Sequence, residues 1–157
     1  MRHRSQAVAL TPDQDVIADQ GIKGLVPVGR PLLDYALSSL ADAGIEQACL
    51  VVGPEHDPIV HRYRDIIRPT RLTITFAVQA EPKGTADAVL AASDFVDQDP
   101  FLVVNSDNIY PVAALSALVS LGAPGLIGYA AAALIAESNI DPARIAQFAL
   151  IQTTPDA

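Results

Sequence analysis

Short apolar runs alternate with segments of helical periodicity along most of this chain. Residues 48–53 and 101–104 are continuous apolar runs typical of strands buried on both faces, whereas residues 72–78 alternate like a half-buried strand. Apolar residues recur at helical spacing in four segments, residues 31–43, 58–67, 86–92 and 112–119. This alternation of helices and strands predicts a three-layer α/β fold with a mostly parallel sheet.

The remaining segments follow weaker signals. Residues 7–10 are expected to form a short strand or a lead-in, and residues 11–19 begin with Thr-Pro-Asp-Gln, a sequence typical of a helix start. Two prolines within residues 25–31 predict an extended connector, because proline cannot donate to a sheet ladder. Beyond the helix that ends near residue 119, the pattern predicts a short strand at residues 126–129, a turn at residues 141–144 and a last strand at residues 147–152.

Composition narrows the classes of protein that this chain can represent. Its 157 residues, half of them apolar, suffice for one domain over residues 1–157. A net charge of -8 argues against a nucleic-acid partner, which would need a basic face, but not against a nucleotide or sugar phosphate. No apolar core of a signal peptide follows the N-terminal charges, and Gly122, Pro124 and Gly125 interrupt the long uncharged stretch, so no membrane partner is expected. These features fit a cytoplasmic protein. They do not decide the oligomeric state, and a homo-oligomer stays open.

Asp107 is the first candidate for chemistry. It lies in an Asn-Ser-Asp-Asn sequence directly after the predicted strand at residues 101–104. Ligands bind outside the carboxyl ends of the strands in an open parallel sheet, and hard cations take oxygen ligands. The alternative is that Asp107 caps the helix that starts near Pro111 or fills a turn.

Three segments, taken together and in this order, resemble the sugar-1-phosphate nucleotidyltransferases. Lys-Gly-Leu-Val-Pro-Val-Gly-Arg-Pro (residues 23–31) is similar to the family's lysine–apolar–Pro-Val-x-x-Pro connector. Gln-Ala-Glu-Pro-Lys-Gly-Thr-Ala (residues 79–86) is similar to its Gln-x-x-Pro-x-Gly-Thr-Ala nucleotide loop, and Val-Asn-Ser-Asp-Asn (residues 104–108) to its strand ending in Gly-Asp-Asn. A weaker match is Gly128 before Tyr129, where the family has a hexose-contacting glycine. The resemblance implies a Rossmann-like nucleotidyltransferase fold.

The resemblance also implies a reaction and its participants. A sugar 1-phosphate attacks the α-phosphorus of an NTP, giving an NDP-sugar and pyrophosphate, with Mg²⁺ as cofactor. Lys23 would supply a cation to the phosphates, and Asp107 would hold the metal. The other implied residues are Gln79, Glu81, Pro82, Gly84 and Thr85 for the nucleotide, and Asn108 and Gly128 for the sugar. The alternatives are a solvated surface lysine at residue 23 and an ordinary turn glycine at residue 84.

The chain departs from the family pattern at both ends. The family's Gly-Gly-x-Gly-Thr-Arg phosphate loop is not found before Lys23, and residues 1–20 look like an insertion. The family's Glu-Lys-Pro motif and second metal-binding aspartate would lie beyond Ala157. We therefore expect a partial domain that is poorly stable, associates through open strand edges and shows negligible transferase turnover. Two other functions stay open: a non-catalytic relative that acts as a regulatory or binding subunit, and an unrelated α/β binding domain of flavodoxin-like type.

Overall fold

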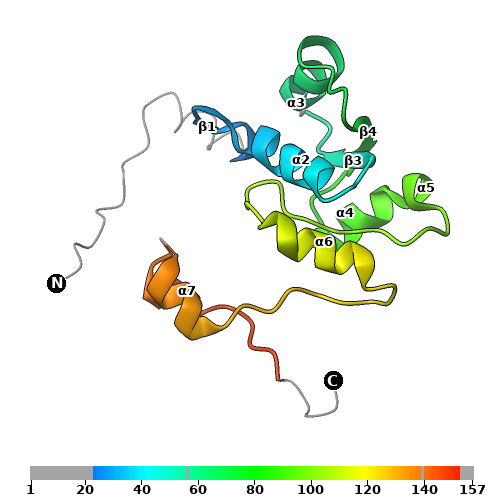
Figure 1. Cartoon of the computed structure of the whole chain (residues 1–157). Coiled ribbons are helices and arrows are strands. Elements are labelled where there is room, and N and C mark those ends of the chain that lie inside the picture. Colours follow the sequence, from blue (N-terminus) through cyan, green and yellow to red (C-terminus); the bar gives the residue numbers. More distant parts are fainter. Residues whose placement is uncertain (1–22, 56, 139, 153–157) are drawn as a thin grey trace. The chain divides into compact units, whose positions relative to one another are not determined.

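The computed structural model describes residues 23–55, 57–138 and 140–152 (Figure 1). The described backbone divides into two compact units, a larger one within residues 23–122 and a smaller one within residues 123–152. The strand or lead-in predicted at residues 7–10 and the helix predicted at residues 11–19 lie outside the described residues. The prediction of a single domain over residues 1–157 stays a prediction.

The larger unit begins with the predicted connector. A single 3-10 turn, η1 (Lys23–Leu25), precedes two short antiparallel strands, β1 (Pro27–Val28) and β2 (Arg30–Pro31). Gly29 turns the chain between them with a φ of 85°, a conformation that favours glycine. The connector therefore forms a small hairpin of its own and does not enter the main sheet, as the prolines predict.

Up to about residue 92, helices and strands then alternate in the order that the sequence predicts, and two further helices follow, the first of which the sequence did not predict. These elements are α2 (Leu32–Asp42), β3 (Gln47–Val52), α3 (Asp57–His61), the π-helix η2 (Arg62–Ile66), β4 (Thr73–Val78), α4 (Thr85–Ala91), α5 (Ser93–Val96) and α6 (Val112–Ser120). Strands β3 and β4 pair in parallel, from Gln47 opposite Thr73 to Val52 opposite Val78. The prediction of a parallel α/β arrangement is confirmed for this pair.

The predicted strand at residues 101–104 is wrong. These residues form no ladder, because in the described part of the chain β3 and β4 pair only with each other. Burial is also one-sided. Phe101 and Val103 are 52% and 56% exposed, while Val104 packs against the core. A strand requires backbone partners as well as apolar side chains, and the sequence pattern reports only the side chains.

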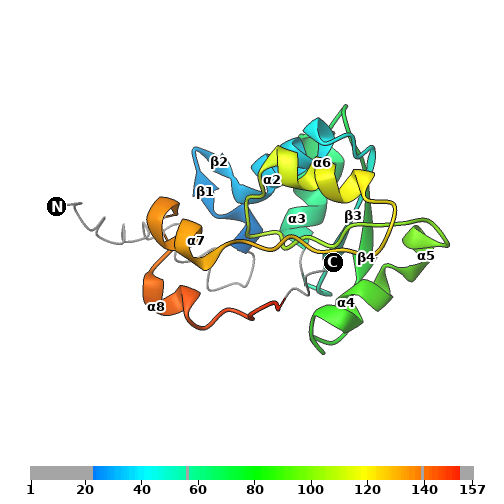
Figure 2. The ribbon, with the colours of Figure 1, turned by 60° about the horizontal axis from the view of Figure 1, so that its bottom comes forward.

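The core of the larger unit lies between α2, α6 and the sheet. Helices α2 and α6 lie on one side of β3 and β4, and α4 lies on the other (Figure 2). The buried residues are Leu33, Ala36, Leu37, Leu40, Ala43, Tyr63, Leu72 and Leu115. Ile67, directly after η2, and Val78, the last residue of β4, are exposed although both are apolar, because each lies where its element ends.

A polar contact fastens α2 to η2 at the margin of this core. Arg62 donates from Nη2 to Asp34 Oδ2 at 2.6 Å, and Tyr63 Oη donates to Asp34 Oδ1 at 2.7 Å. Burial raises the pKa of Tyr63 above its ordinary range, and the hydrogen bond to Asp34 and the charge of that carboxylate raise it further. The Asp34 carboxylate also raises the pKa of Arg62, so the guanidinium stays charged.

The Tyr63 environment predicts an alkaline loss of stability. Both the folded and the unfolded chain hold the phenol proton below about pH 10, whereas above it the unfolded chain releases that proton first. The free energy of unfolding should therefore fall with rising pH, by up to about 1.4 kcal/mol per unit. Between about pH 9 and about pH 11, the free energy of unfolding measured by urea denaturation should fall by about 1 kcal/mol less in Tyr63→Phe than in the parent chain. The exposed Tyr129→Phe is the control, and equal drops in the two variants would contradict the assignment.

The described residues of the smaller unit form two helices, α7 (Ala131–Glu137) and α8 (Pro142–Ile145). Asp141 caps α8 by accepting from the Ala143 amide at 2.7 Å, so the predicted turn is one helical turn. The strands predicted at residues 126–129 and 147–152 are wrong, because neither segment joins a ladder. No helix among the described residues has the length and apolar character needed to cross a membrane.

Candidate functional site

The loop that carries Asp107 is held at its base by Tyr110. The Tyr110 hydroxyl accepts from the Asn105 amide at 3.2 Å and from Asn108 Nδ2 at 3.3 Å. The Asn108 amide also donates to the Asn105 carbonyl at 3.4 Å. Asp107 lies exposed in the turn between these contacts. Helix α6 starts after Pro111 without a side-chain cap, so the capping alternative for Asp107 is excluded.

The predicted lysine segment lies against this loop. Gly24 of η1 is buried, and a Cβ built on it would stand 3.3 Å from the Ser106 carbonyl oxygen and 3.4 Å from Leu33 Cβ. Such contacts are tighter than ordinary ones, so glycine permits the close approach. The structure thus brings the backbone of Lys23–Leu25 beside the loop of Asp107. The side chain of Lys23 lies outside the part of the chain that the structure describes.

The predicted nucleotide loop follows β4 and is closed by Gln79. The backbone N–H of Gln79 donates to the Val52 carbonyl at 2.8 Å, which places Gln79 at the carboxyl ends of β3 and β4. Its Nε2 donates to the Gly84 carbonyl at 3.1 Å and to Asp87 Oδ2 at 2.8 Å. Gly84 precedes α4 with a φ of 104° and open space at its Cβ position. Backbone conformation, and not crowding, therefore requires glycine there, as the turn-glycine alternative also expects.

A small cavity of about 200 Å³ lies beside this loop. Its lining residues are Val78, Gln79, Ala80, Glu81, Lys83, Asp87, Leu90 and Ala91. Gln79 and Glu81 were predicted for the nucleotide, whereas the predicted Pro82, Gly84 and Thr85 do not line the cavity. Lys83 and Asp87 were missed. Lys83 stands between Pro82 and Gly84 inside the predicted nucleotide loop, and that place in the motif was the available signal, whereas Asp87 lies in the first turn of α4 and had none.

Charge within the cavity is partly compensated. Lys83 Nζ lies 3.0 Å from Glu81 Oε2, and both side chains are largely exposed. An ion pair in that setting contributes little to stability, so Lys83 is available to a competing anion.

The structure does not join all the predicted site residues. No hydrogen bond or ion pair between described residues connects the Asp107 loop with the Gln79 loop. Gly128 belongs to the smaller unit, where an added Cβ would meet Ile151 Cδ1 at an ordinary 3.8 Å. Local packing therefore does not require glycine at residue 128, and the sugar-binding roles of Asn108 and Gly128 stay predictions.

The oxygen donors of the Asp107 loop are compatible with Mg²⁺. The described ranges hold no group of three His, Cys, Asp or Glu side chains that could enclose a metal. Mg²⁺ usually keeps several waters and binds through one or two carboxylates together with substrate phosphates. A single exposed carboxylate therefore fits a metal that arrives with its phosphates, and does not fit a metal enclosed by protein alone.

Comparison with known proteins agrees with the motifs. Residues 17–125 match the Nucleotidyl transferase family. The chain is 39% identical over 89 residues to the UTP--glucose-1-phosphate uridylyltransferase AglF of Haloferax volcanii, covering 56% of this chain and 35% of that protein. It is 36% identical over 111 residues to a mannose-1-phosphate guanyltransferase of Schizosaccharomyces pombe, covering 67% of this chain and 31% of that protein. A glucose-1-phosphate thymidylyltransferase of Streptomyces griseus is 37% identical over 93 residues, covering 59% of this chain and 26% of that protein. The chain thus spans about a third or less of the length of these relatives.

Proposed function

This chain belongs to the nucleotidyl transferase family, and on that basis we propose that it binds an NTP with Mg²⁺ for transfer of the nucleotidyl group to a sugar 1-phosphate. The relatives are named for that reaction with uridylyl, guanylyl or thymidylyl groups. The observation that carries the proposal is the close packing of Gly24 on Ser106. It puts the segment of the predicted cation next to the loop of the predicted metal ligand.

The proposed chemistry is a displacement at phosphorus. An oxygen of the sugar phosphate forms a bond to the α-phosphorus, the bond from that phosphorus to the bridging oxygen breaks, and pyrophosphate leaves with the electron pair. Two anions must approach each other, so positive charge and in-line positioning supply most of the catalysis. Bound Mg²⁺ would add positive charge at the phosphate oxygens.

Each predicted residue has a defined task in this proposal. Asp107 holds the metal, and Lys23 neutralises phosphate charge as the second cation. Gln79 reads the base through Oε1, since both hydrogen-bond donors of its amide nitrogen are used within the loop, on Gly84 and Asp87. Lys83 lies in the same cavity and contributes positive charge toward the nucleotide phosphates.

Calorimetric titration with UTP, dTTP and GTP, with Mg²⁺ or with a chelator, tests the metal role. Asp107→Ala should lose the Mg²⁺-dependent part of the affinity, about tenfold or 1.4 kcal/mol. The matched control is Asp99→Ala, which removes an exposed carboxylate outside the candidate site with the same change in net charge. Lys23→Ala should weaken binding both with and without the metal, because its charge acts on the phosphates directly.

Two results would contradict the proposal. One is nucleotide affinity that the chelator leaves unchanged in the parent chain. The other is an equal affinity for the Asp107→Ala and Asp99→Ala variants, with circular dichroism showing that both are folded.

A further inference from the structure

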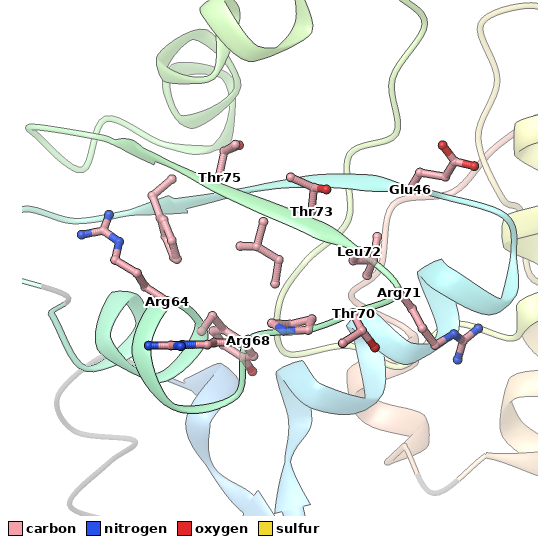
Figure 3. A pocket seen from close by; sticks show the side chains of 12 residues that line it. Glu46, Arg64, Arg68, Thr70, Arg71, Leu72, Thr73 and Thr75 are labelled. Atoms are coloured by element: carbon pink, nitrogen blue, oxygen red, sulfur yellow. The ribbon is translucent and has the colours of Figure 1, made fainter.

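A second, larger groove lies on the opposite side of η2 from the connector hairpin and follows the outer edge of β4 (Figure 3). Its volume is about 770 Å³. The lining residues come from the end of η2, the segment after it and β4 itself: Glu46, Tyr63, Arg64, Arg68, Pro69, Thr70, Arg71, Leu72, Thr73, Ile74, Thr75 and Phe76. None of the residues assigned above to nucleotide, metal or sugar belongs to this set.

The groove exposes backbone groups that a further strand can pair with. It is lined by consecutive residues of β4, Thr73 to Phe76, whose side chains alternate between the two faces of the sheet. A groove lined by side chains from both faces of the sheet must run along the edge of the strand. The backbone amides of Thr73 and Gln79 donate to the carbonyls of Glu46, just before β3, and Val52, at its end. The odd-numbered residues of β4 therefore form the hydrogen bonds to β3. In a parallel ladder, the amides and carbonyls of Ile74 and Phe76 then point to the unpaired edge.

The charge beside this edge is positive, against the trend of the chain. Arg64, Arg68 and Arg71 line the groove with one carboxylate, Glu46, in a chain of net charge -8. Figure 3 shows these arginines spread along one side of β4, with Thr73 and Thr75 on the other. The guanidinium of Arg64 lies over the ring of Phe76, 5.3 Å from its centroid. Aromatic stacking leaves the edge of a guanidinium open to carboxylates.

Existing ion pairs leave this charge available. Arg71 donates to Asp42 at 2.6 Å, but both side chains are at least half exposed, and such pairs contribute little. The strongly held arginine is Arg62, which pairs with the largely buried Asp34 and does not line the groove.

We propose that an extended acidic segment of a partner protein adds to the free edge of β4. Its backbone pairs with the outward groups of Ile74 and Phe76, and its carboxylates meet Arg64, Arg68 and Arg71. Main-chain pairing at an exposed edge supplies affinity in this recognition mode, and side-chain contacts supply selectivity. The run of consecutive β4 residues in the lining and the free strand edge favour a peptide over a single small anion, which would need only the arginines.

The test uses the whole chain and a fluorescent peptide of about seven residues, an ordinary strand length, with alternating glutamate and valine. Anisotropy should show binding of this peptide and not of its counterpart with lysine in place of glutamate. Arg64→Glu combined with Arg68→Glu should weaken binding at least tenfold. Arg68→Glu alone should also weaken binding, and its control with the same change in net charge is Arg144→Glu, at an exposed arginine of the smaller unit.

Amide hydrogen exchange separates strand addition from ionic attraction. The Ile74 and Phe76 amides should exchange quickly in the free protein and slowly with the acidic peptide, while those of Thr73 and Thr75 are protected in both. Binding without new protection at Ile74 and Phe76 would overturn the proposal, as would failure of the acidic peptide to bind. Protection that rises with protein concentration alone would show a second copy on this edge, and would also overturn it. These readouts do not involve nucleotide, so they are independent of the proposed transferase function.

Discussion

Replacing Asp34 with alanine is expected to lower the free energy of unfolding by about 3–5 kcal/mol. The Asp34 carboxylate receives two hydrogen bonds from Arg62 and one from Tyr63. Its side chain is only 11% exposed, so removal leaves a guanidinium and a phenol without a partner in a poorly solvated place. The contact joins α2 to η2, two segments separated by β3, and its loss should loosen the packing between them.

Urea denaturation of matched variants checks this expectation. Asp42→Ala removes another carboxylate of α2, which is 50% exposed and paired with Arg71, and should cost at most about 1 kcal/mol. Asp34→Ala with Arg62→Ala should recover part of the loss, because the uncompensated charge is gone as well. If Asp34→Ala costs no more than Asp42→Ala, the buried network does not fasten the two helices.

Leu115→Ala is expected to cost about 2–5 kcal/mol of unfolding free energy. Leu115 is the most deeply buried side chain of the described residues, at 1% exposure, and belongs to the cluster that joins α6 to α2. Truncation removes buried methyl groups and leaves a cavity that two packed helices cannot fully close.

A neighbouring position on α6 provides the control. Val119 is exposed, so Val119→Ala should change stability by no more than about 0.5 kcal/mol in the same denaturation assay. Similar small effects in both variants would mean that α6 is not part of the stable core. Because α6 follows the Asp107 loop directly, that result would also leave the proposed metal ligand on an unanchored segment.

The local pattern alone determined the connector, the helices α2, α3, α4 and α6 and the two paired strands, but not the helices α5 and α7. The apolar face of α2 is readable because residues three and four apart meet on one side of a helix. Pro31 precedes that helix, and Gly44, with a φ of 90°, follows it. These are local effects of side-chain periodicity and backbone preference. The motifs at residues 79–86 and 104–108 were equally readable, because each is a short contiguous sequence.

Only the tertiary structure decided which of these pieces meet. The apolar run at residues 101–104 reads as a strand, yet it has no ladder among the described residues, because pairing depends on a partner remote in sequence. The packing of Gly24 on Ser106 and the charge network of Asp34 likewise join residues far apart along the chain. Contacts of that kind carry no local signature, since they arise from the way α2, η2 and β4 pack around one core. The sequence by itself therefore determined the connector, most helices of the larger unit, the two paired strands and the family resemblance, and the tertiary structure decided which side chains act together.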